Sequence, residues 1–174
     1  MSWTVKVTYS LAVAAYVAAL SAAQAAERLD VNGTLVGEGR PTGWAPNKPG
    51  YWDEDGTVAL TPIADLEMNS VRLSSATRAM HLYYTRRFAA EEGDRILVSC
   101  IMRGEGAGSL GVYFYPAGGW MKREFSVSGD WGEYSVELAL GAGTREISVV
   151  IGIPPCASAE FLDLTARISG KKEP

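Results

Sequence analysis

The sequence predicts an all-β fold, a β-sandwich or barrel of about ten antiparallel strands. The first observation is a series of short segments rich in Val, Ile, Leu, Tyr and Phe, separated by clusters of Gly, Pro, Asn and Asp. The second is that apolar and polar residues alternate within these segments, as they do on a half-buried strand. The third is that the 3.6-residue spacing of an amphipathic helix is nearly absent after Ala26.

Residues 1–25 have the pattern of a cleavable secretory signal. Lys6 adds positive charge before the apolar run Leu11–Leu20, and Ala23 and Ala25 are the small residues that a signal peptidase requires. The alternative is a retained membrane anchor, but Thr, Ser and Gln interrupt the stretch of roughly 20 apolar residues that a span needs. We therefore expect a secreted, periplasmic or cell-envelope protein with no membrane span after cleavage.

Residues 26–168 are expected to form one domain, because their length fits a single core, and residues 169–174 are expected to be a polar tail. The 16 basic and 20 acidic side chains give the whole chain a formal net charge of −4. This balance favours solubility and argues against a nucleic-acid partner, which would call for a basic stripe.

Strands are expected wherever β-branched, aromatic and leucine residues lie between turn signals. In the first half of the domain these segments are Leu29–Val36, Thr57–Thr61, Ser70–Ser74, Met80–Phe88 and Arg95–Arg103. In the second half they are Ser109–Tyr115, Lys122–Val127, Gly132–Leu140, Arg145–Ile153 and Glu160–Ile168. Glycine-rich turns are expected at 104–108 and 116–119, and a long irregular stretch at 43–56.

The period of two assigns one face of each strand to the core. The rows expected to point inward are Ile96, Val98, Cys100 and Met102; Leu110, Val112 and Phe114; Tyr134, Val136 and Leu138; and Ile147, Val149, Ile151 and Ile153. Trp44 and Trp131 are expected to fill the core as well. Two antiparallel sheets packed on these rows account for the pattern.

The two cysteines, Cys100 and Cys156, allow two interpretations. In an oxidising compartment they can pair as a disulfide. Alternatively, both are small apolar residues in the interior, where free cysteines are commonly found. The spacing alone leaves both interpretations open.

No catalytic residues are predicted. His81 is the single histidine, no serine lies in a G-x-S-x-G motif, and the sequence has no H-E-x-x-H motif. Pairs of carboxylates can hydrolyse glycosides, but alternating acidic residues such as Glu133 and Glu137 are typical of a solvated strand face. A small hydrolase using such a pair is therefore ranked behind the two binding functions described below.

Aromatic residues away from the core rows predict a surface that binds carbohydrate. Sugar rings stack their C–H patches on aromatic faces, and their hydroxyl groups match nearby carboxylate, amide and guanidinium groups. Tyr113 and Tyr115 lie on one strand face, about 7 Å apart by strand rise. The candidate ligand-binding residues are Tyr113, Tyr115, Tyr83, Arg87, Tyr51, Trp52 and Trp120.

Short motifs resemble those of galactose-binding-like carbohydrate-binding modules, the group that includes the CenC-type modules. Asn32–Leu35 followed by Pro41–Trp44 is similar to their N-G-x-x…P-x-G-W opening, and Gly129–Tyr134 is similar to their G-x-W-x-x-Y element. Further segments resemble later strands of these modules: Asn69–Leu73, Phe88–Arg103 and Glu160–Asp163. The resemblance implies a jelly-roll sandwich with a glycan cleft on one sheet face or at the loops.

The resemblance also implies a structural calcium ion in many such modules. Of the acidic residues expected to hold it, only Asp163 is matched here, because Thr34 and Val36 occupy the first-strand positions. No cofactor is required by the expected function, which is non-catalytic binding of a polysaccharide or other glycan. The alternative is a structural or protein-interaction component of the cell envelope, which uses the same surface for partner proteins.

Overall fold

The computed structural model describes residues 27–29, 31, 35–36, 40–46, 56–64, 66 and 68–169. The predicted signal segment, residues 1–25, and the candidate residues Tyr51 and Trp52 lie outside these ranges. Regular structure within them consists of β-strands, which confirms the predicted all-β class. None of the described residues belongs to a helix long and apolar enough to cross a membrane.

The strands follow one another along the chain with short connections after residue 68. In order they are β1 (Glu27–Arg28), β2 (Leu35–Val36), β3 (Arg40–Pro41), β4 (Trp44–Pro46), β5 (Gly56–Ile63), β6 (Met68–Ser75), β7 (Met80–Tyr84), β8 (Phe88–Ala89), β9 (Arg95–Pro116), β10 (Trp120–Val127), β11 (Gly132–Ala139), β12 (Thr144–Ile153) and β13 (Ala157–Ser169). Strands β2 and β3 form a separate small ladder.

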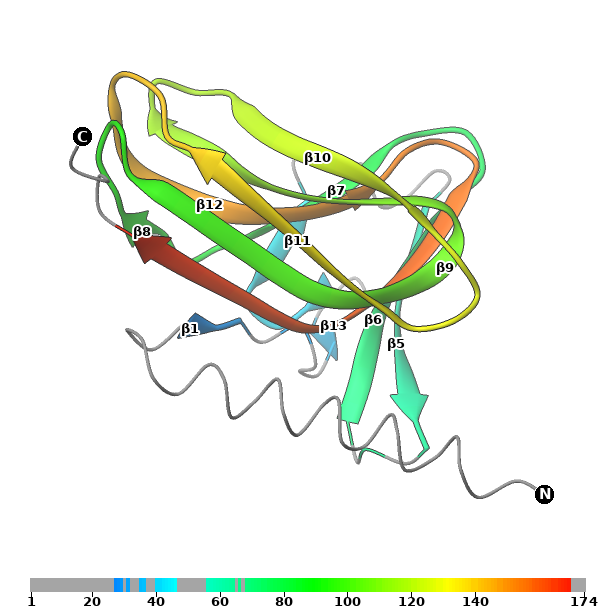
Figure 1. Ribbon diagram of the computed structural model, residues 1–174. Coiled ribbons are helices and arrows are strands. Elements are labelled where there is room, and N and C mark those ends of the chain that lie inside the picture. Colours follow the sequence, from blue (N-terminus) through cyan, green and yellow to red (C-terminus); the bar gives the residue numbers. More distant parts are fainter. Residues whose placement is uncertain are drawn as a thin grey trace.

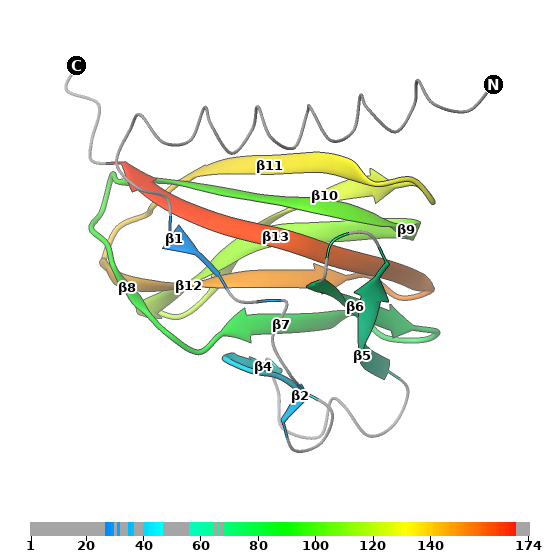
Figure 2. The same cartoon turned by 90° about the horizontal axis from the view of Figure 1, so that it is seen from below.

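Strand β9 belongs to both layers of the sandwich. Its first half pairs with β11 and β13, and its second half pairs with β10 and β12. The first layer therefore runs β11–β9–β13–β6–β5, with β1 beside β13, and the second runs β10–β9–β12–β7–β4, with β8 beside β12. These strand pairs are antiparallel and belong to one sheet. Figures 1 and 2 show that this sheet curls, so that its two halves face each other as the two layers. The predicted jelly-roll β-sandwich is confirmed.

The glycine-rich turn predicted at 104–108 is wrong, because these residues continue β9 from one layer into the other. Gly104 pairs with Ala159 on β13, and a Cβ atom at Gly104 would lie 2.0 Å from the carbonyl oxygen of Ser158. A side chain at this position would therefore collide with the neighbouring strand. Glycine marks a close approach of two backbones here rather than a chain reversal.

The predicted core rows are confirmed. Residues from both layers pack into one cluster, in which Ile96, Val98, Met102, Leu110, Val112, Ile147 and Ile151 are fully buried. Trp44 is also buried and lies against the ring of Tyr84, with 5.2 Å between the ring centroids. Trp131 was predicted in the core, but it is only half-buried, and the guanidinium of Arg103 lies 4.5 Å from its ring centroid on the outside of the first layer.

Two predicted strands are interrupted. Leu29–Val36 was expected as one strand, whereas the structure has β1 before Leu29 and β2 at the end of the range. Met80–Phe88 is divided because Thr85 leaves the ladder: both its backbone N–H and its hydroxyl donate to the carbonyl oxygen of Gly43. The loop 85–87 between β7 and β8 carries Arg87.

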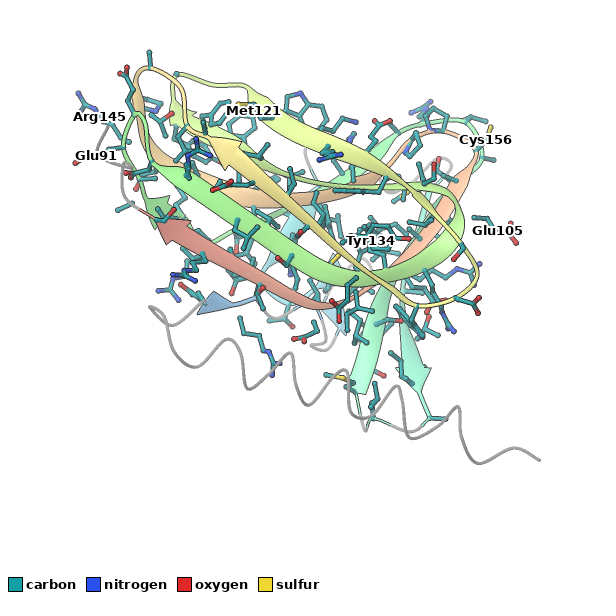
Figure 3. All side chains as sticks on the ribbon, viewed as in Figure 1. Glu91, Glu105, Met121, Tyr134, Arg145 and Cys156 are labelled. Atoms are coloured by element: carbon teal, nitrogen blue, oxygen red, sulfur yellow. The ribbon has the colours of Figure 1, made fainter. Side chains whose placement is uncertain are left out.

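Both cysteine thiols are free. Cys100 is buried in the core, and burial raises its pKa well above the usual thiol value. Cys156 is exposed in the turn between β12 and β13, where its thiol donates to the carbonyl oxygen of Ala76 at 2.9 Å. In Figure 3 this turn and Glu105 lie at the opposite end of the sandwich from Glu91 and Arg145.

Candidate functional site

Aromatic side chains gather on the outer face of the second layer. Because Leu110, Val112 and Leu82 point into the core, the alternate residues on the same strands point outward. This outer surface, the aromatic face, is defined by Tyr83, Tyr113, Tyr115 and Trp120. The strand register places Trp120 opposite Tyr113, and Tyr113 opposite Ser148. Three of the predicted tyrosines and Trp120 therefore share one surface, contributed by β7, β9 and β10.

Tyr113 and Tyr115 are neighbours, as predicted, but their rings are not coplanar. Their ring centroids lie 4.9 Å apart and their planes are tilted by 53°. Both side chains are half-buried and neither is sealed beneath other residues. The tilt means that the pair presents two differently oriented surfaces rather than one flat strip.

Arg87 joins this pair from the loop between β7 and β8. Its guanidinium lies 3.8 Å from the ring centroid of Tyr115 and forms an ion pair with Glu146 at 3.1 Å. The hydrogen bond to Glu146 raises the pKa of Arg87, whose guanidinium is already charged at any pH at which proteins fold. Glu146 is the register partner of Tyr115, which places the cation, the carboxylate and the ring in one cluster. Arg87 thus lies beside Tyr115 from a loop, and not beside Tyr83 on one continuous strand.

Trp120 lies at the centre of a second cluster on the same face. Its ring meets the imidazole of His81 edge-on, with 4.2 Å between centroids and an interplanar angle of 79°. Lys122 Nζ lies 3.4 Å from His81 Nε2 and 2.7 Å from a carboxylate oxygen of Glu124. Trp120 remains 39% exposed, so an aromatic surface is open beside a buried polar group.

His81 is held in its neutral form. It is only 6% exposed, and burial together with the charge of Lys122 lowers its pKa from 6.5 to about 4, although Glu124 acts in the opposite direction. The neutral ring can accept a hydrogen bond from the Lys122 ammonium at Nε2, which leaves Nδ1 as the donor. A proton on His81 would instead place a second positive charge beside Lys122.

We predict that the ring signals of His81, the single histidine, titrate near pH 4 in NMR spectra. In the unfolded chain the same group has its usual pKa of about 6.5. As the pH falls between these values, the unfolded chain binds a proton that the folded chain does not, and stability is lost. His81 lowers the free energy of unfolding by at most about 3 kcal/mol. This loss is complete once the pH is below the pKa of His81 in the folded protein. His81→Gln is the control that should remove this part of the pH dependence, and a midpoint near the usual value in the parent would contradict the burial.

The remaining candidates differ in their relation to the face. Tyr83 points outward from β7, and it is separated from β9 by Val150 of β12, which is the register partner of Tyr83 and of Gly111. Tyr83 therefore flanks the Tyr113 cluster without joining it. Tyr51 and Trp52 lie outside the described residues, so their place in the site stays a prediction.

Several of the acidic residues have basic partners in the described part of the chain. Glu124 and Glu137 form ion pairs with Lys122 and Arg95 on different layers. The carboxylate of Asp163, the residue matched to calcium, lies 2.8 Å from the guanidinium of Arg28. No group of three or more His, Cys, Asp or Glu suited to a metal occurs among the described residues.

Sequence reasoning missed Lys122, Glu124 and Ser148 as members of the face. Lys122 and Glu124 follow Trp120 at intervals of two, so strand alternation already places all three on one side. Ser148 alternates with the core residues Ile147 and Val149 in the same way. Alternation was the signal that could have found all of these residues.

Comparison with known proteins supports the fold. No family model and no curated protein matches the chain. The enzymatically active domain of bacteriophage CBA120 tailspike protein 4 matches with a TM-score of 0.60 and 12% identity, over 81% of this chain and 21% of that chain. An arabinose-bound α-L-arabinofuranosidase matches with a TM-score of 0.53 and 14% identity, over 73% of this chain and 23% of that chain. The chain thus spans less than a quarter of either enzyme.

A third similar structure is matched along almost its whole length. It is a mutant of CBM29-2, a family 29 carbohydrate-binding module, complexed with mannohexaose. The TM-score is 0.51 and the identity 12%, and the match covers 86% of this chain and 99% of that chain. The chain therefore has the β-sandwich fold found in carbohydrate-binding modules. The predicted resemblance is supported at this level, while membership of the CenC-type group is not confirmed.

Proposed function

We propose that the aromatic face binds carbohydrate without chemical conversion. The observation that carries the proposal is the row of partly open rings on β9 and β10, interleaved with Arg87, Lys122 and two glutamates. Sugar C–H patches gain contact with Tyr113 and Trp120, and sugar hydroxyls find donors and acceptors beside them. The fold shared with a module solved in complex with mannohexaose supports the same function.

The charges on the face favour an uncharged ligand. Arg87 is paired with Glu146, and Lys122 is paired with Glu124, so each cation already has a carboxylate partner. An acidic sugar would have to displace one of these carboxylates to gain an ion pair. The net charge of −4 adds repulsion of polyanions at longer range. We therefore propose that the ligand is a neutral polysaccharide.

The geometry of the rings favours a single glycan chain over a flat crystalline surface. A planar surface needs coplanar rings that touch it together, whereas Tyr113 and Tyr115 are tilted by 53°. A flexible chain can follow differently oriented rings one after another. We also propose that residues 1–25 direct export, which places this binding outside the cytoplasm.

Affinity electrophoresis tests the proposed function. We predict that soluble neutral polysaccharides (a mixed-linkage glucan, a galactomannan, a xylan or a galactan) retard the protein in native gels, whereas alginate and microcrystalline cellulose particles do not bind it. Because stacking and neutral hydrogen bonds dominate, retardation should persist in high salt, which screens exposed charges. Absence of retardation, together with self-association in sizing experiments, would favour the alternative of a structural or protein-interaction component of the cell envelope.

A further inference from the structure

Ser148 carries a buried hydroxyl that the fold does not use. It lies on β12 between the core residues Ile147 and Val149, so its side chain points to the outer side of the second layer. The residue is fully buried, and its Oγ has no hydrogen-bond partner among the described residues. Leaving a buried hydroxyl unpaired costs free energy, so its presence requires an explanation.

The position of Ser148 relates it to the aromatic face. On one side its register partner is Tyr113 of β9. On the other side the ladder is interrupted, because β7 ends at Tyr84 and β8 begins at Phe88. One step along β12 on the same side is Glu146, which holds Arg87 over Tyr115. Ser148 thus lies at the floor of the face, beside a gap in hydrogen-bonded strand pairing.

The groups around this floor differ in how easily they move. The side chain of Arg87 is 50% exposed, and it is held by an exposed ion pair and by contact with one ring. Exposed ion pairs contribute little to stability, so Arg87 can leave Tyr115 at small cost. The backbone of β12, by contrast, is hydrogen-bonded to β9 and fixes Ser148 in place.

We infer that Ser148 is a specificity-determining residue, whose hydroxyl bonds to a hydroxyl group of the bound glycan when Arg87 moves off Tyr115. This inference rests on the proposed carbohydrate-binding function and identifies a contact within it. The ligand supplies the partner that the free protein lacks, so the contact favours sugars with a hydroxyl at this position. Sugars without that hydroxyl leave Ser148 unpaired.

Ser148→Ala tests the inference, because its effects on stability and on binding are expected to separate. The substitution removes a hydroxyl that has no partner in the free protein, so the Tm should stay unchanged or rise. Binding should weaken by about 5- to 10-fold, the usual effect of one lost hydrogen bond. The measurement is the dissociation constant from affinity electrophoresis in the four neutral polysaccharides, with thermal unfolding of the same samples.

Ser70→Ala is the matched control, since Ser70 is equally buried on the outer side of the other layer. Its hydroxyl donates to Glu160 at 2.9 Å, so this variant should lose several degrees in Tm and bind glycan as the parent does. Equal binding by Ser148→Ala and the parent, or a Tm loss like that of Ser70→Ala, overturns the inference for Ser148. If none of the polysaccharides retards the parent, the proposed function itself fails, which is a distinguishable result.

Discussion

Gly152→Ala is expected to destabilise the protein by about 1–3 kcal/mol, the usual cost of forcing extra atoms into a packed site. Gly152 lies opposite His81 in the β12–β7 ladder. A Cβ atom there would lie 2.6 Å from the backbone oxygen of Met80 and 2.3 Å from the imidazole Cδ2 of His81. The backbone oxygen cannot move without opening the ladder, and the imidazole already lies against the ring of Trp120. Urea unfolding measures the loss.

Gly129→Ala is the appropriate control for this substitution. Gly129 is exposed, and a Cβ atom there would have no heavy atom within 4 Å among the described residues outside its own chain neighbours. Its unfolding midpoint should match that of the parent. An unchanged midpoint for Gly152→Ala would contradict the close packing of β7 against β12 and the position of His81 against Gly152.

Tyr113→Ala is expected to weaken glycan binding by about 1–3 kcal/mol, by analogy with the stacking of a base on an aromatic ring. Tyr113 lies between Trp120 on β10 and Ser148 on β12 and contacts Tyr115. Its removal therefore breaks the face at its centre. The fold should change little, because the side chain is half-buried on the outer side of the layer. Titration calorimetry with the best-retained neutral polysaccharide measures the loss.

Trp131→Ala provides an aromatic control on the opposite layer. Trp131 is half-buried like Tyr113, but its ring lies under Arg103, away from the aromatic face. This variant should bind glycan as the parent does. A larger loss of affinity from Trp131→Ala than from Tyr113→Ala would place the ligand on the first layer and refute the assignment.

Much of the fold could be predicted because strand alternation is a local property. The rows Ile96–Met102 and Ile147–Ile153 have one apolar face each, and burial of that face sets which tyrosines point outward. The continuation of β9 through Gly104 could not be predicted in this way. Glycine is typical of turns, and its role against Ser158 depends on a strand more than fifty residues later in the chain.

The candidate site was predictable as a set of residues but not as a geometry. Alternation placed Tyr113 and Tyr115 together, but it does not give the 53° tilt between their rings or the position of Arg87 over Tyr115. The lowered pKa of His81 depends on burial and on Lys122 from a strand that is not adjacent to β7. The unpaired hydroxyl of Ser148 is a property of its surroundings in three dimensions, which no sequence pattern records.

The most direct measurement of sugar recognition by this face is a glycan array probed with the parent protein and with Tyr113→Ala and Tyr115→Ala. We predict that the parent binds a group of uncharged oligosaccharides and that both variants lose most of this signal while they remain folded. The proposal that this face binds carbohydrate would be contradicted by either of two results. One is binding of the same glycans by both variants at the level of the parent, and the other is no binding by the parent to any glycan.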